Sequence, residues 1–282
     1  MLNNYKLDNK VINNFSNTRL SFLFPAVLLL FVIIFMLLKE SVFNVNEYVE
    51  TQKDLFFYFN SRLSKLPNLQ FNLTQLGNPI ISLPLLTVFI LYAPKLWDAV
   101  LTSSIIGGLL SILLKRLFAI PRPAAMFDND SFVIIGKTLA STHSSMPSGH
   151  SIIIFIIITI LLFAFMPKEL KLKIFLTFFI LTLGLIIAFS RVGIGAHYPL
   201  DVVIGSAIGY ISAVVGIVIN NNVSWWTWLK NKKYYPILIL LLTIWIFAII
   251  SEIIINNLLI FYFSLIALII TLYLIIDIYA KK

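Results

Sequence analysis

Long apolar runs dominate this chain and leave it few possible folds. A helix needs about 17 to 25 apolar residues to cross the hydrocarbon core of a bilayer. Because 60% of the residues are hydrophobic and 12% are charged, we expect lipid to be the solvent for most of the chain. The sequence predicts an all-α, polytopic membrane helix bundle of about eight transmembrane helices, at residues 22–38, 77–94, 97–117, 148–166, 174–190, 199–219, 235–253 and 258–278.

Basic residues in the short loops predict the orientation of this bundle, because cytoplasmic loops carry an excess of Lys and Arg. With the N-terminus in the cytoplasm, most of the 21 cations lie inside: Lys6, Lys10, Arg19, Lys95, Lys168, Lys171, Lys173, Lys230, Lys232, Lys233, Lys281 and Lys282. The net charge of +9 is therefore interpreted as a topology signal and not as a nucleic-acid-binding surface.

The chain contains no cysteine, which excludes disulfides, thiolate metal sites and thiol nucleophiles. Its three histidines are too few and too scattered to indicate a histidine metal cluster. We therefore expect no metal and no cofactor. Frequent Ile, Phe, Asn and Lys resemble the residue usage of AT-rich bacterial genomes, which favours a bacterial membrane.

Two segments between the first four predicted spans are expected to lie on the outer side. Residues 39–76 contain an aromatic cluster, Phe56-Phe57-Tyr58-Phe59, which predicts an interfacial helix with its aromatic side toward lipid. A structured loop that caps the bundle is an equal alternative. Residues 124–146 form the second outer segment. Its His143 is expected to have a surface or packing role, and contact with the substrate headgroup is the alternative.

Charged and polar residues gather in three blocks at the ends of the third to sixth predicted spans. They are Lys115 with Arg122-Pro123, then Pro147-Ser148-Gly149-His150, and then Ser190-Arg191 with His197 and Asp201. Because these span ends share one side of the bilayer, we expect the blocks to converge there. With the orientation given above, that side is the outer one.

The blocks supply the groups that cleavage of a phosphate ester requires. A phosphoryl group needs charge neutralisation, an in-line nucleophile and a proton for the leaving oxygen. Lys115, Arg122 and Arg191 offer cations, and guanidinium groups match phosphate oxygens bidentately. Ser148 and Gly149 begin a predicted span, where free backbone N–H groups and the helix dipole attract an anion. Ser148 on its own would also serve as an ordinary helix cap.

His197 and Asp201 form the second half of this chemistry. Pro199 is well placed as the first residue of the sixth span, so a carboxylate at Asp201 can reach back toward the residue before the helix. Asp201 can then fix the tautomer of His197 and leave its other nitrogen free to attack phosphorus. An ordinary first-turn pair that stabilises the helix start is the alternative interpretation.

The spacing Lys-x6-Arg-Pro, Pro-Ser-Gly-His and Ser-Arg-x5-His-x3-Asp resembles the signature of the type 2 phosphatidic acid phosphatase (PAP2) superfamily of membrane lipid phosphatases. The resemblance covers residues 97–219. It implies that His197 forms a phosphohistidine, that Asp201 orients it, and that His150 protonates the leaving group and then activates water. The phosphate would be bound by the cations Lys115, Arg122 and Arg191. Ser148 and Gly149, at the start of the fourth predicted span, would also bind it.

The resemblance also implies a division of the chain. Residues 1–21 would be a cytoplasmic segment, residues 22–219 a six-span PAP2-like core that includes the outer segment 39–76, and residues 220–282 a cytoplasmic loop with two additional spans. The expected location is the bacterial cytoplasmic (inner) membrane, with the site facing the periplasm or cell exterior.

The expected substrate is a lipid phosphate or diphosphate, because a site at span ends admits a headgroup while the tails stay in the bilayer. Undecaprenyl diphosphate is favoured; phosphatidylglycerol phosphate, phosphatidate and lipid A phosphates are the alternatives within the superfamily. A phosphohistidine could also pass its phosphoryl group to another lipid, which would make the protein a phosphotransferase. A transporter or scaffold that merely retains the motif is the non-enzymatic alternative.

Overall fold

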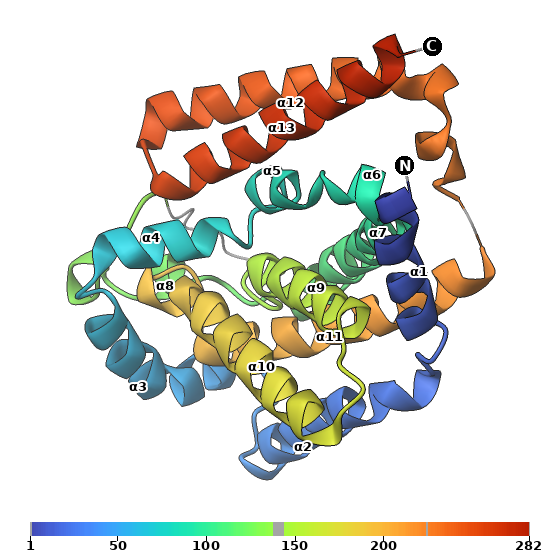
Figure 1. Ribbon diagram of the computed structural model, residues 1–282. Helices are drawn as coiled ribbons and strands as arrows, with labels where there is room; N and C mark the ends of the chain where they lie inside the picture. Colours follow the sequence, from blue (N-terminus) through green and yellow to red (C-terminus); the bar gives the residue numbers. More distant parts are fainter. Residues whose placement is uncertain (1, 138–143, 224, 282) are drawn as a thin grey trace.

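The computed structural model describes residues 2–137, 144–223 and 225–281, and the described residues form helices without a strand (Figure 1). His143 lies outside the described residues. The α-helices are α1 (Leu2–Phe15), α2 (Phe24–Lys39), α3 (Val45–Leu63), α4 (Pro67–Gln75), α5 (Pro79–Ser82), α6 (Phe89–Tyr92), α7 (Pro94–Phe118), α8 (Pro123–Met126), α9 (Gly149–Ala164), α10 (Leu170–Gly193), α11 (Pro199–Asn222), α12 (Tyr235–Asn256) and α13 (Leu259–Ala280). Short 3₁₀ helices occur at Leu20–Leu23, Pro84–Leu86, Asn129–Ser131, Thr227–Lys230 and Lys232–Tyr234.

Six helical stretches of the described chain are long and apolar enough to cross a membrane, which fits an integral membrane protein. They are Leu20–Lys39, Pro94–Met126, Leu170–Gly193, Pro199–Asn222, Lys232–Asn256 and Leu259–Ala280. The predicted all-α membrane bundle is confirmed, whereas the predicted count of eight spans is not. The two predicted spans that fall short are 148–166 and 77–94.

The predicted span 148–166 is α9, a helix of 16 residues at the centre of the bundle. Ten of its residues are buried, and α1, α7, α10 and α11 pack around it (Figure 1). Its apolar sequence therefore reflects contact with other helices more than contact with lipid, and a helix in that setting need not match the full bilayer thickness.

The predicted span 77–94 is broken into α5, a 3₁₀ helix and α6. Pro79, Pro84 and Pro94 each stand at the start of a helical element, where the missing N–H removes no hydrogen bond. The segment still runs from one end of the bundle to the other: Gly77 packs against His150 at the start of α9, and Lys95 bonds the carbonyl of Asn220 at the end of α11. Irregular backbone at membrane depth is tolerated where protein buries it.

The C-terminal hairpin of α12 and α13 covers this broken segment. The two helices lie side by side along one edge of the bundle, next to α4 and α5 (Figure 1). Trp245 Nε1 donates to the carbonyl of Ile80 at 2.8 Å, and Ser264 Oγ donates to the carbonyl of Ile81 at 2.7 Å. Side chains of the hairpin thus satisfy backbone groups that water cannot reach inside a bilayer.

Close approach of α11 to α9 depends on glycine. A Cβ at Gly205 would lie 2.6 Å from the carbonyl oxygen of Ser148, and one at Gly209 would lie 2.4 Å from that of Ile152. Small residues four positions apart let two membrane helices pack backbone to backbone. This packing brings the first turns of α9 and α11 together at the same end of the bundle.

The segment 39–76 forms α3 and α4, which pack on α10 and, for α3, also on α11. Phe56 is fully buried, and its ring contacts those of Tyr198, Phe127 and Phe132. The expectation that the aromatic cluster faces lipid is therefore wrong for Phe56, because the rings of the two outer segments pack on each other. Tyr58 is half exposed. The alternative, a segment that caps the bundle, describes the structure better.

Replacing Ser264 with Ala is expected to destabilise the folded protein by about 1 kcal/mol, the usual worth of a buried interhelical hydrogen bond in a membrane protein. The measurement is reversible unfolding in mixed micelles. Ser251→Ala is the matched control, since the Ser251 hydroxyl bonds the carbonyl of Phe247 within its own helix at an exposed position. Equal stability of the two variants would contradict the role given to the hairpin.

Candidate active site

Asp201 lies in the first turn of α11 and is completely buried. Its Oδ2 accepts a hydrogen bond from the Tyr198 N–H at 3.0 Å, so the carboxylate reaches back to the residue before the helix, as the spacing around Pro199 predicts. Ser145 Oγ donates to the same oxygen at 2.6 Å, and Tyr48 OH donates to Oδ1 at 2.7 Å. Both carboxylate oxygens are thus hydrogen-bonded, which offsets the cost of burying the charge.

His197 lies beside this carboxylate in the turn before α11, with a side chain that is 1% exposed. Its Nδ1 is 3.4 Å from Asp201 Oδ2 and 3.4 Å from Ser145 Oγ. A proton on Nδ1 facing the carboxylate would leave Nε2 with a free lone pair, and that is the tautomer a nucleophilic imidazole needs.

The surroundings of His197 also favour its neutral form. Burial, followed by the positive charges of Arg191, Arg122 and Lys115, lowers its pKa well below the usual value, and a hydrogen bond with the backbone of Ser145 opposes the shift. The imidazole is therefore expected to be uncharged at neutral pH, with the lone pair on Nε2 available.

The first block of cations lies where α7 ends. Lys115 is in the last turn of α7, which stops at Ala119 in a left-handed conformation with φ of 46°. Arg122 follows in extended backbone, and Pro123 then begins α8. Lys115 Nζ points toward the start of α9, since it would lie 3.9 Å from a Cβ built on Gly149.

Arg191 approaches from the last turn of α10 and is 7% exposed. Its NH1 group donates to Thr74 Oγ1 at 2.9 Å, which holds the guanidinium to α4. The Nε atoms of Arg191 and Arg122 are buried and have no hydrogen-bond partner among the described residues. Buried guanidinium donors without partners are suited to receive an anion.

Ser148 and Gly149 begin α9, as the sequence predicts, but Ser148 has a structural task. Its Oγ caps the helix by accepting from the Ser151 N–H at 3.4 Å, and its own N–H donates to the carbonyl of Asp201 at 3.1 Å. The Ser148 N–H is therefore already used. The anion-binding donors at this helix start are expected to be the first-turn N–H groups, from Gly149 onward, that have no partner within the helix.

His150 is in the same first turn of α9 and is half buried. A Cβ on Gly77 would lie 2.6 Å from His150 Cβ, so the backbone of the broken segment packs directly on this residue. His150 lies within electrostatic reach of His197 and of the cations Lys115, Arg122 and Arg191. The structure thus brings the three sequence blocks together at one end of the bundle.

Helix α3 contributes a stripe of residues to the site that the sequence reasoning missed. Besides the bond from Tyr48 to Asp201, Gln52 Oε1 accepts from the Leu200 N–H at 3.0 Å. Asn60 Nδ2 donates to the carbonyl of Val192 at 3.1 Å. Phe56 lies between Gln52 and Asn60 on the same face of α3. The four-residue spacing of Tyr48, Gln52, Phe56 and Asn60 was the available signal.

Ser145 and Thr74 were also missed, and no pattern in the sequence singles out either one. Arg116 lies about 100° around the helix from Lys115 and is exposed. No group of three or more His, Cys, Asp or Glu residues in the described chain could hold a metal ion.

Residues 97–225 match the family model described as the PAP2 superfamily. This segment belongs to the PAP2 superfamily. All the predicted site residues lie within it, and membership supports a phosphatase. The crystal structure of Aquifex aeolicus LpxE is similar at 24% sequence identity, with a TM-score of 0.47, over 58% of this chain and 93% of that one. No curated protein matches the chain.

Tyr48→Phe is expected to lower kcat about 10- to 100-fold, because a hydrogen bond to a buried charge contributes about 1.5–3 kcal/mol. KM should change little, since Tyr48 positions Asp201 and the predicted phosphate-binding groups lie elsewhere. The measurement is steady-state phosphate release in mixed micelles. Tyr58→Phe, on the exposed face of the same helix, is the control. A loss confined to KM, or an equal effect in the two variants, would contradict the positioning role.

Proposed function

We propose that this protein is a metal-independent lipid phosphatase that forms a phosphohistidine at His197. The observation that carries the proposal is the buried pair of His197 and Asp201 beside three cations, at the ends of helices in a membrane bundle. The same geometry supports residues 22–219 as the catalytic core. In this proposal, residues 220–282 supply an additional loop and hairpin.

The proposed reaction has two displacements at phosphorus. Lys115, Arg122 and Arg191 bind the phosphoryl oxygens while His197 Nε2 attacks phosphorus and the bond to the leaving oxygen breaks. His150 donates a proton to that oxygen. In the second step His150 takes a proton from water, the water oxygen attacks phosphorus, the P–N bond breaks, and inorganic phosphate leaves with His197 restored.

The proposed substrate is the phosphate or diphosphate group of a membrane lipid. A site at helix ends lets a headgroup enter while acyl or prenyl chains remain in the bilayer. Undecaprenyl diphosphate is our first candidate, and phosphatidylglycerol phosphate, phosphatidate and lipid A phosphates are the others. The residues of the motif contact only the phosphoryl group that all of these share.

Phosphate release from these purified lipids, with EDTA present, is the direct test. We expect turnover by the wild-type protein, inhibition by vanadate, and no phosphoenzyme in His197→Ala. In His150→Ala the phosphoenzyme should still form from a substrate with a good leaving group, but its hydrolysis should slow by about 10² to 10⁴.

Full activity of a folded His197→Ala protein, or a strict requirement for added magnesium, would refute this mechanism. An acceptor lipid added to the same assay separates hydrolysis from phosphotransfer. Appearance of a phosphorylated acceptor in place of inorganic phosphate would make the protein a phosphotransferase with the same first step.

We further propose that the site faces the periplasm or cell exterior, in the cytoplasmic membrane of a bacterium. The support is the excess of Lys and Arg in the loops at the other end of the bundle. Because the chain has no cysteine, single cysteines report sidedness directly. Asn129→Cys should react with a membrane-impermeant thiol reagent in intact cells, and Asn231→Cys only after permeabilisation; both positions are exposed. The reverse labelling would place the site in the cytoplasm.

A further inference from the structure

Two adjoining cavities meet at the end of the bundle opposite the catalytic residues, and the larger one extends along the bundle as far as Val203 of α11. Helix α9 begins at Gly149, next to His150, and has 16 residues, so its far end is about 24 Å from the site at 1.5 Å per residue. The smaller cavity has a volume of about 510 Å³ and the larger one about 1000 Å³. They share one wall, made of Asn14, Met166, Pro167 and Lys168.

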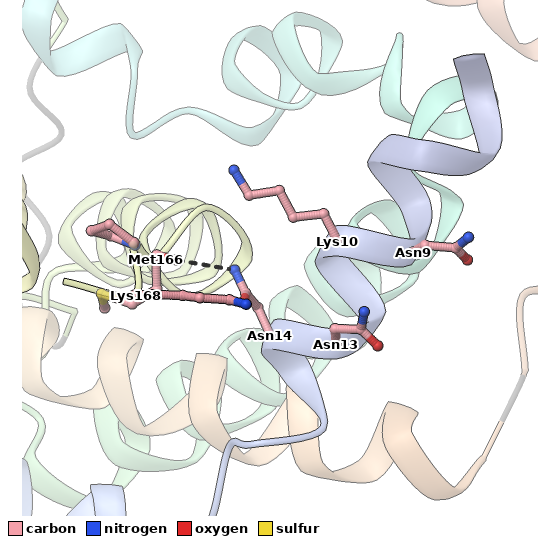
Figure 2. Close-up of a pocket in the computed structure, with 7 residues that line it drawn as sticks. Asn9, Lys10, Asn13, Asn14, Met166 and Lys168 are labelled. Atoms are coloured by element: carbon pink, nitrogen blue, oxygen red, sulfur yellow. Dashed lines mark hydrogen bonds between the residues drawn. The ribbon is translucent and has the colours of Figure 1, made fainter.

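The smaller cavity is lined by basic and amide side chains together with Met166 and Pro167. Lys10 of α1 and Lys168 of the α9–α10 connection line it, and Figure 2 shows the amine of Lys168 beside Asn14. Asn14 Nδ2 donates to the carbonyl of Ala164 at 2.8 Å and to that of Met166 at 3.3 Å, which fixes this wall to the end of α9. Lys173 lines the larger cavity, and no Asp or Glu lines either one.

The larger cavity is an apolar groove between α2 and the central helices. Only Ala26 of α2 is buried, so this helix covers the bundle loosely and leaves a long apolar surface between itself and α10. The apolar lining includes Leu29 of α2, Phe155 and Leu162 of α9, and Phe178, Leu181 and Leu185 of α10.

Thr18 lies between α1 and the 3₁₀ helix Leu20–Leu23. It lines the larger cavity, is 7% exposed, and its Oγ1 has no hydrogen-bond partner among the described residues. A buried hydroxyl without a partner is costly, so such an atom beside a cavity indicates a polar group of a ligand.

We propose that these cavities form a second lipid-binding site, specific for an anionic phospholipid. The phosphate of the headgroup lies among Lys10, Lys168 and Lys173, a headgroup or ester oxygen bonds Thr18, and an acyl chain follows the groove between α2 and α10. A free anion would leave the apolar groove unused. A zwitterionic or neutral lipid would place no net negative charge among the three cations.

The experiment measures lipid retained by the purified full-length protein in native mass spectrometry. Phosphatidylglycerol, phosphatidylcholine and glycerol 3-phosphate are offered separately at equal concentration. We expect phosphatidylglycerol to be retained about tenfold more than phosphatidylcholine, and glycerol 3-phosphate not to be retained. Equal retention of the two lipids would identify ordinary annular lipid, and retention of glycerol 3-phosphate would identify a site for soluble anions; either result overturns the proposal.

Two variants test the contacts themselves. Lys168→Glu should reduce retention of phosphatidylglycerol at least fivefold, since each cation near a lipid phosphate contributes about 1 kcal/mol. Lys171→Glu has the same charge change at an exposed position that lines neither cavity, and should change retention less than twofold. Thr18→Val should reduce retention severalfold with the thermal stability of the lipid-free protein unchanged or raised. Equal effects of the two lysine variants, or unchanged retention in Thr18→Val, would refute the assignment.

Discussion

Burial of one negative charge organises the catalytic end of this protein. The Asp201 carboxylate is fully enclosed, and a buried ion is stable only when its hydrogen-bonding capacity is satisfied. The donors come from parts of the chain that are far apart: Tyr48 from α3, Ser145 from the segment before α9, and Tyr198 from the turn before α11. Holding this charge therefore fixes how three segments meet, and His197 takes its position from the same contacts.

The contacts between the helices that carry the site reflect their lipid surroundings. In a bilayer there is little hydrophobic driving force between helices, so close van der Waals packing and hydrogen bonds have to hold them together. Gly205 and Gly209 allow α11 to touch the backbone of α9, and the Ser148 N–H then reaches the carbonyl of Asp201. Arg191, held by Thr74, has its guanidinium fixed before any substrate arrives, which reduces the conformational entropy lost on binding.

The sequence predicted the membrane bundle and the convergence of Lys115, His150 and His197, because both depend on local patterns and on which span ends share a side. It did not predict that Phe56 faces protein or that residues 77–94 are broken, because hydrophobicity does not distinguish burial in lipid from burial in protein. The partnership of Tyr48 with Asp201 joins residues 153 positions apart. No spacing rule relates residues so far apart in the sequence. The packing of α3 on α11 brings Tyr48 and Asp201 together.

The hydrogen bonds to the carbonyls of Ile80 and Ile81 connect the C-terminal hairpin to the broken segment 77–94. A chain ending before α12 would retain every residue of the PAP2 motif. It would also leave the carbonyls of Ile80 and Ile81 without these donors in hydrocarbon, close in the sequence to Gly77, which packs on His150. Contacts that support the core thus cross the boundary suggested by sequence resemblance. In this protein the helices that support the backbone near the site extend beyond the segment that carries the chemistry.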